Sequence, residues 1–163
     1  MPMSLSKRAD DYIYRLGVDQ RTIKRQLDGL QESDLFLQPQ PRGNCANWVL
    51  GHIVQGRQNI LRTLGLDAFW TADEEAIYAR GSQPITSEAS PHLTMQRLLG
   101  DLAQAEDILI VRLEQITDEE WDVLDEDGDS LAKVINFQIW HEGYHVGQFE
   151  VLRQLTGVND HVI

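Results

Sequence analysis

Two histidines four residues apart, His141 and His145, lie in one amphipathic segment, and a third, His52, lies in a similar segment earlier in the chain. An α-helix turns once every 3.6 residues, so His141 and His145 project from one helical face, one turn apart. Imidazole is the commonest metal-binding side chain, and this spacing allows two imidazoles to hold one ion. The pattern therefore predicts a metal site.

The histidines belong to polar patches within helical stripes that are apolar at their ends or along their flanks. The later stripe consists of Leu131, Val134, Gln138, His141, His145, Gln148 and Leu152, and the earlier one of Trp48, His52, Gln55 and Asn59. Polar groups facing a core are costly unless each finds a partner, and a shared ion would satisfy the imidazoles together. Three neutral histidines leave at least one coordination position open, as in catalytic zinc sites. The alternative, a histidine hydrogen-bonded within the core, stays open for His52 above all.

Four long amphipathic segments must position these residues. We expect helices over residues 5–30, from Asn44 or Asn47 to Leu64, from Ser90-Pro91 through Leu113, and from Ser130 to Thr156, with short helical pieces after the capping boxes at Thr71 and Thr117. No alternating strand pattern of useful length is present. This organisation predicts an all-α fold, an up-down four-helix bundle with short extra helices in its connections, as a single domain over residues 1–163.

Charge and hydropathy restrict the partners. The 163 residues include 26 acidic and 14 basic side chains, a formal net charge of −12. Such a surface repels phosphate backbones and anionic lipid heads, so we expect neither a nucleic-acid nor a membrane partner. No apolar run approaches the roughly 18 residues that span a bilayer, and the N-terminus is polar. These features indicate a cytoplasmic protein.

Other residues that could do chemistry carry weaker signals. Cys45 is the only cysteine, so it forms no internal disulfide, and a small buried side chain at a helix start is favoured over a nucleophile. The acidic turn at residues 125–129 fails as an EF-hand loop, because Val123 and Val134 would occupy ligand positions. We expect His92, in the first turn of the third helix, and His161 to be exposed, with His161 within reach of a neighbouring subunit.

Three stretches resemble a known family. They are Trp48-Val49-Leu50-Gly51-His52, His141-Glu142-Gly143-Tyr144-His145-Val146-Gly147-Gln148 and Leu152-Arg153-Gln154-Leu155-Thr156-Gly157. Together they resemble the DinB-like, YfiT-related family of metal-binding bundles over nearly the whole chain. The resemblance implies a divalent metal held by three histidines, by position His52, His141 and His145, often in a homodimer. Val146 stands where the family usually has an arginine, which removes a cation near the site.

Members of this family with known activity use thiol cofactors, as mycothiol-dependent isomerases and bacillithiol transferases. The resemblance thus implies a metal-dependent thiol S-transferase or related enzyme acting on a small-molecule substrate. Zinc, nickel, iron or manganese would suit three imidazoles and could polarise a carbonyl or lower the pKa of a bound thiol or water. Gln55, Tyr144 and Gln148 are candidates for contacts to the ligands or the substrate.

Two further hypotheses stay open. Glu142 points about 100° away from His141 on a helix, which makes it a poor general base unless it meets a neighbouring helix, and this disfavours a self-contained hydrolase. The alternative function is a non-catalytic stress-response protein, in which the ion mainly fastens two helices and stabilises the fold. The last possibility is an ordinary helical interaction module with core histidines and no metal.

Overall fold

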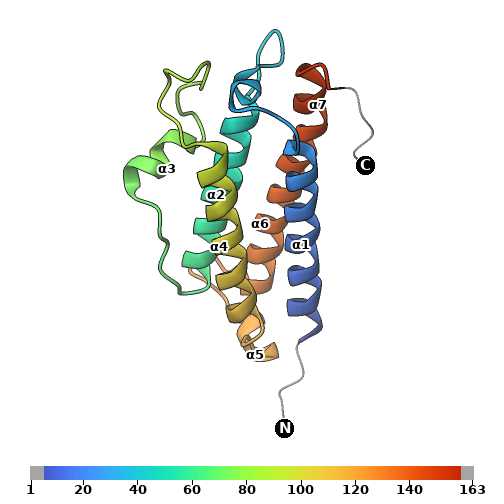
Figure 1. Ribbon diagram of the computed structural model, residues 1–163. Helices are drawn as coiled ribbons and strands as arrows, with labels where there is room; N and C mark the ends of the chain where they lie inside the picture. Colours follow the sequence, from blue (N-terminus) through green and yellow to red (C-terminus); the bar gives the residue numbers. More distant parts are fainter. Residues whose placement is uncertain (1–5, 159–163) are drawn as a thin grey trace.

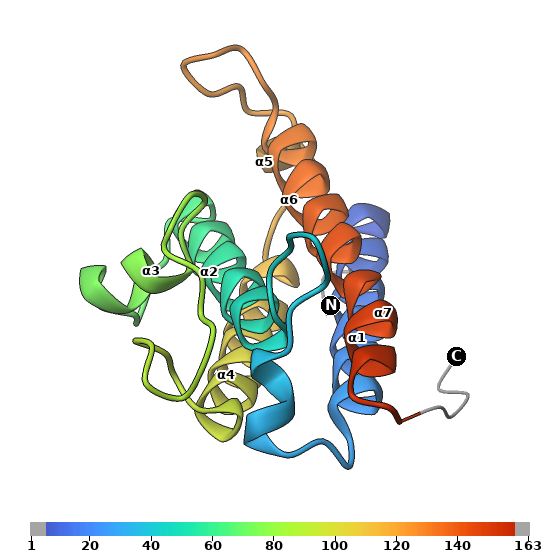
Figure 2. The ribbon, with the colours of Figure 1, turned by 90° about the horizontal axis from the view of Figure 1, so that it is seen from above.

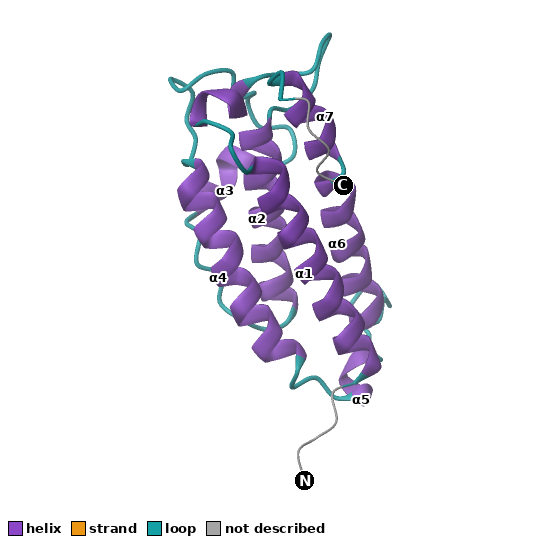
Figure 3. Ribbon diagram, turned by 45° about the vertical axis from the view of Figure 1, so that its right-hand side comes forward, coloured by secondary structure: helices purple, strands orange, loops and turns teal. Residues whose placement is uncertain are grey.

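Four long helices form the body of the molecule in the computed structural model, which describes residues 6–158 (Figure 1). These are α1 (Lys7–Leu27), α2 (Ala46–Thr63), α4 (Met95–Leu113) and α6 (Leu131–Val146). The connections hold η1 (Glu32–Phe36), α3 (Ala72–Tyr78) and α5 (Asp118–Trp121), and α7 (Gln148–Leu155) follows α6. The part of the chain described has no strand (Figure 3). The predicted all-α four-helix bundle is confirmed, while His161 lies outside the described residues.

The long helices run up, down, down and up in chain order (Figure 1), so α2 and α4 do not alternate in direction as in the simple up-down bundle that the sequence predicts. Helices α1 and α6 are parallel neighbours, because Tyr12 near the start of α1 donates to the carbonyl of Ala132 near the start of α6 (3.0 Å). Helices α2 and α4 are also parallel, because Asn47 near the start of α2 donates to the carbonyl of Leu93 just before α4 (2.8 Å). The connection over residues 64–94 therefore returns along the length of the bundle, and it carries α3 outside the four long helices (Figure 2).

Side-chain caps begin several helices where the sequence predicts them. The hydroxyl groups of Thr71, Thr117 and Ser130 each accept a hydrogen bond from the backbone N–H three residues later. Such caps satisfy backbone donors that have no partner within the helix. The predicted starts of α3, α5 and α6 are thereby confirmed.

The predicted start of the third long helix is wrong. Helix α4 begins at Met95 and is capped by Thr94. The hydroxyl of Ser90 is engaged in the preceding turn, where it accepts from the N–H of Thr86 (3.2 Å), so it does not cap a helix. His92 consequently precedes α4, and its half-buried ring packs edge-on against Phe36, with centroids 5.0 Å apart. The prediction that His92 is an exposed residue of a first helical turn is therefore also wrong.

The last predicted helix is divided in two. Helix α6 ends at Val146, α7 begins at Gln148, and Gly147 lies between them. Glycine is less favourable than alanine within a helix by about 1 kcal/mol, because it loses the most backbone freedom on folding. Gly143 and Gly147 stand one turn apart at this position, so the helix is weakest where it ends.

A polar layer separates two apolar clusters in the core. One cluster, towards the α2 start, includes Ile23, Leu50 and Phe149, and the other includes Leu16, Leu61 and Trp121. Between them along the helices lie Gln20, Arg57 and Glu142, all buried. No helix among residues 6–158 combines the length and hydropathy needed to cross a membrane.

Candidate metal centre

The three predicted histidines converge. His52 comes from α2, and His141 and His145 come from α6; one ring nitrogen of each lies within 4.8 Å of the other two. The Nε2 atoms of His141 and His145 are 3.1 Å apart. Nitrogens bound at about 2.0–2.1 Å to one tetrahedral ion lie about 3.3 Å from each other. The spacing of the His141 and His145 nitrogens therefore fits a shared ion, and the His52 nitrogen lies beside this pair.

Hydrogen bonds at Nδ1 orient two of the rings. His52 Nδ1 lies 2.8 Å from the carbonyl oxygen of Tyr78, and His145 Nδ1 lies 3.0 Å from Oε1 of Gln148. Both oxygens accept, so each Nδ1 carries the proton and each Nε2 keeps its lone pair for a metal. Such partners of ligating histidines fix the tautomer and the ring plane. Gln148, one of the candidate contact residues, thus lies at His145.

Burial favours the neutral imidazoles of His141 and His145. Burial lowers the pKa of His145 to about 4, with smaller contributions from the neighbouring histidines. Burial and the nearby His52 also lower the pKa of His141. Metal ions bind the neutral imidazole, so protons do not compete for these two rings at pH 7.

An aromatic ring flanks each histidine. Trp48 stacks on His52, with centroids 4.6 Å apart and an interplanar angle of 14°. Phe137 lies parallel to His141 at 6.2 Å, and Tyr144 meets His145 edge-on at 5.2 Å. Trp48 is buried, whereas Phe137 and Tyr144 are exposed. Each of the three histidines therefore has an aromatic neighbour, and the two such neighbours on α6 are exposed.

Of the two exposed aromatic neighbours, the sequence identifies Tyr144 as a candidate contact residue but not Phe137. Tyr144 is among the predicted contact residues, and it lies against His145. Phe137 was missed, although it precedes His141 by four residues and so shares its helical face. Gln55, another predicted contact residue, donates from Nε2 to the carbonyl of Glu75 (3.2 Å) and joins α2 to α3.

Glu142 is held in a buried ion pair. Its Oε1 accepts from Nη2 of Arg57 at 2.7 Å, and both side chains are almost inaccessible to solvent. Nη1 of Arg57 donates to Oε1 of Gln20 (2.8 Å) and to the carbonyl of Leu102 (3.0 Å), so groups from all four long helices meet at one guanidinium. Glu142 does meet a neighbouring helix, but as the partner of Arg57. The spacing of Leu50, Arg57 and Leu64, seven residues apart, is the signal that could have placed Arg57 in the core.

Gly51 permits a close approach beside His52. A Cβ atom at Gly51 would lie 2.2 Å from the ring of Tyr78, whose carbonyl holds His52 Nδ1. Gly51→Ala is therefore expected to displace Tyr78, to lower the free energy of unfolding by about 1–3 kcal/mol, and to weaken metal binding. Urea unfolding and a zinc titration measure the two effects.

Gly56→Ala is the matched control, because a Cβ atom at Gly56 of the same helix meets nothing within 4 Å. It should stabilise the protein slightly, by up to about 1 kcal/mol, and leave zinc affinity unchanged. Equal behaviour of the two variants would contradict the role assigned to the contact between Gly51 and Tyr78.

Asp19 of α1 carries a carboxylate with a raised pKa beside the polar layer. Burial, and then the charge of Glu142, raise its pKa to about 7, although Arg57 and Arg15 oppose the shift. Between about pH 4 and pH 7, Asp19 is therefore protonated in the folded protein but ionised in the unfolded chain. Across this range the contribution of Asp19 to stability becomes less favourable as the pH rises.

Asp19→Asn should thus increase the free energy of unfolding more at pH 8 than at pH 4. We expect a difference between the two pH values of about 1–3 kcal/mol, because Asp19 is only partly shielded from solvent. Urea unfolding of both proteins across the pH range measures it. A gain that does not change with pH would show that Asp19 keeps an ordinary pKa in the folded state.

Cys45 is buried where α2 begins, and burial raises the pKa of its thiol. A thiol with a raised pKa is a poor nucleophile at neutral pH. The prediction of a small buried side chain at a helix start is confirmed.

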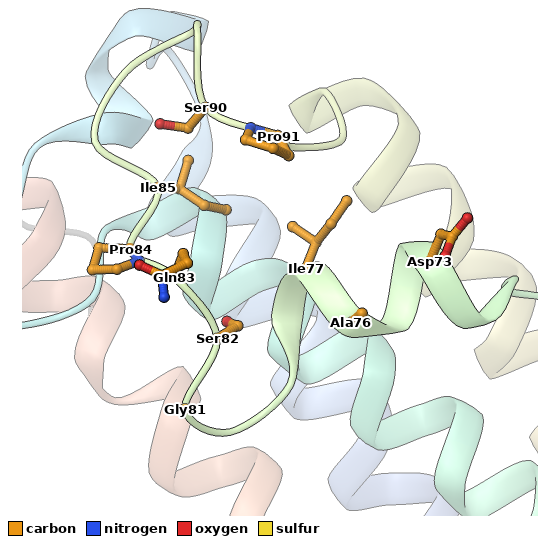
Figure 4. A pocket seen from close by; sticks show the side chains of 10 residues that line it. All are labelled: Asp73, Ala76, Ile77, Gly81, Ser82, Gln83, Pro84, Ile85, Ser90 and Pro91. Atoms are coloured by element: carbon orange, nitrogen blue, oxygen red, sulfur yellow. The ribbon is translucent and has the colours of Figure 1, made fainter.

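A separate cavity of about 420 Å³ lies between α3 and residues 81–91 (Figure 4). Ile77 and Ile85 face it, and Asp73 is the one ionisable residue among those that line it. Ser82 in its wall accepts a hydrogen bond from the indole of Trp48 (2.8 Å), the residue that stacks on His52. The cavity thus borders the support of one candidate ligand but holds no cluster of reactive groups.

Comparison with known proteins identifies the family and the fold. The family model described as the DinB superfamily matches residues 17–149. Among solved structures, YfiT from Bacillus subtilis, described as a probable metal-dependent hydrolase with an unusual four-helix bundle topology, is similar with a TM-score of 0.66 and 19% sequence identity. The similarity covers 95% of this chain and 91% of that one. No curated protein matches the chain.

Proposed function

The chain belongs to the DinB superfamily, and from this premise we propose that it is a divalent-metal-dependent enzyme that activates a low-molecular-weight thiol for transfer to an electrophile. The proposed ligands are the Nε2 atoms of His52, His141 and His145. A bound zinc, nickel, iron or manganese ion would supply Lewis acidity that lowers the pKa of a thiol or water in its remaining positions. The observation that carries the proposal is the convergence of three imidazole nitrogens within 4.8 Å.

The residues around the rings support a thiol as the activated group. Among the described residues, none of the hydrogen bonds and ring contacts of the three imidazoles involves a carboxylate, and Glu142 is held by Arg57. Zinc hydrolases with the His-Glu-x-x-His pattern use its glutamate as general base. Glu142 stands at that position in this chain, but its carboxylate is paired with Arg57. A thiol has an ordinary pKa of about 8.5, so it loses its proton near neutral pH with little assistance. Tyr144 and Phe137 would then contact the thiol or its acceptor.

A hydrolase is the second candidate, because the similar YfiT structure is described as a probable metal-dependent hydrolase. The same three ligands would serve it, with water as the activated group. The bacillithiol or mycothiol type of co-substrate, the homodimer and the cytoplasmic location stay predictions from the sequence.

One panel of assays distinguishes thiol transfer from hydrolysis. Protein loaded with zinc, nickel, iron or manganese is mixed with bacillithiol, mycothiol, glutathione or cysteine and an electrophilic acceptor such as monobromobimane, and separately with activated esters and amides. We expect metal-dependent consumption of one thiol above the spontaneous rate. The control variant His145→Ala, which lacks a proposed ligand, should be inactive.

Other outcomes would overturn the transferase. Ester or amide hydrolysis without thiol transfer would identify a hydrolase at the same centre. No turnover of either panel, together with a lower melting temperature after chelation, would identify a non-catalytic protein that the ion stabilises.

A further inference from the structure

A second cavity, of about 370 Å³, lies between α1 and α6. Its lining consists of Arg15, Asp19, Ile139, Trp140, Gly143 and Tyr144. Gly143 leaves the backbone of α6 uncovered here, and a Cβ atom added to it would lie 3.7 Å from Oδ2 of Asp19. The carboxylate of Asp19 therefore faces a space that no side chain of α6 fills at this position.

Asp19 forms no ion pair with Arg15, a basic residue on its own helix. Arg15 is four residues away on the same helix, a spacing at which acidic and basic side chains usually pair. Arg15 instead donates from Nη1 to Oδ1 of Asn136 (2.9 Å). Among residues 6–158, the carboxylate of Asp19 has neither a hydrogen bond nor an ion pair. Its pKa is raised to about 7 by burial and then by the charge of Glu142. A positive charge inside the cavity would pair with the Asp19 carboxylate and lower its pKa.

Two exposed aromatic rings stand beside this carboxylate. The side chains of Trp140 and Tyr144 are 55% and 58% exposed, and their centroids lie 6.2 Å apart. The indole N–H groups of the other three tryptophans donate to protein oxygen atoms, whereas that of Trp140 has no such partner in the described part of the chain. Aromatic faces attract ammonium groups, most strongly when a quaternary or alkylated nitrogen leaves water.

We propose that the cavity between α1 and α6 binds a small organic cation with a single ammonium group. Asp19 is its counter-ion, Trp140 and Tyr144 face its alkylated nitrogen, and Ile139 contacts its apolar part. Arg15, held at the cavity by Asn136, disfavours ligands that carry a second positive charge. The net charge of −12 raises the local concentration of cations at the surface. None of the three histidines lines this cavity, and the site needs no metal, although Tyr144 borders both sites.

Choline and its uncharged isostere 3,3-dimethyl-1-butanol test the proposal. The indole N–H signal of Trp140, assigned by its absence from Trp140→Phe, is followed by nuclear magnetic resonance in the metal-free protein at pH 8. We expect a saturable shift of this signal with choline, and affinity at least about tenfold weaker for the alcohol. An equal response to both compounds, or no response to choline, would overturn the proposal.

Two aspartate variants of α1 complete the test. Asp19→Asn, which should be more stable than the wild-type protein, is expected to weaken choline binding at least about tenfold. Asp11→Asn, at an exposed position of the same helix, removes the same charge and should leave the affinity within about twofold. Retention of choline binding by Asp19→Asn, or equal losses in both variants, would show that Asp19 is not the counter-ion.

Discussion

His145→Ala is expected to weaken zinc binding at pH 7.5 at least about 100-fold. The variant removes one of three nitrogens from the centre, and His145 is the most deeply buried of the three histidines. Loss of a partner that only orients a ligand already costs about 10–100-fold in affinity, so loss of the ligand itself should cost more. Competition against a chromophoric chelator measures the dissociation constant, and elemental analysis measures the metal content.

Two variants calibrate this result. Gln148→Ala, which removes the partner of His145 Nδ1, should lose about tenfold in affinity. His92→Ala removes a half-buried histidine that packs on Phe36 and should bind zinc like the wild-type protein. Unchanged zinc content in His145→Ala would contradict the assignment of His145 as a ligand.

Arg57→Ala should lower the free energy of unfolding by about 3–5 kcal/mol. The change leaves Glu142 without its partner in the interior, and it also removes the donors that serve Gln20 and the carbonyl of Leu102. Breaking a buried ion pair by removing one member has costs of this size, because the remaining charge is uncompensated. Since small domains are stable by only about 5–15 kcal/mol, urea unfolding will show a large shift of the midpoint.

A double variant separates the charge from the packing. Arg57→Met with Glu142→Met should recover at least about half of the loss, because apolar residues of similar volume often replace buried ion pairs without cost. Arg8→Ala breaks the exposed pair with Asp122 and should leave the urea midpoint almost unchanged, because solvent screens an exposed ion pair. A loss below about 1 kcal/mol for Arg57→Ala would show that the buried pair contributes little to the fold.

The sequence predicts the helices and the pair of His141 and His145 because both depend on local spacing. A separation of four residues places His141 and His145 on one face whatever the rest of the chain does, and an apolar stripe orients that face towards the core. The stripe around His52 predicts that it points inward. The caps at Thr71, Thr117 and Ser130 are equally local, since each hydroxyl reaches a backbone N–H three residues away.

The features that the sequence does not reveal depend on contacts between distant segments. Ser90 satisfies the local rule for a cap, but its hydroxyl is already bonded to the preceding turn. Arg57 meets groups from the three other long helices, and no spacing within α2 identifies those partners. The unpaired state of Asp19 likewise depends on α6, which supplies Asn136 to Arg15 and a glycine opposite the carboxylate.

X-ray absorption spectroscopy of the zinc-loaded wild-type protein tests whether three histidines hold one metal ion. We expect one zinc ion per chain, with three imidazole nitrogens at about 2.0–2.1 Å and the multiple-scattering pattern of histidine rings. Each of the single alanine variants of His52, His141 and His145 should lose one such ring. A protein that binds no zinc, or whose zinc has oxygen neighbours alone, would contradict the three-histidine centre.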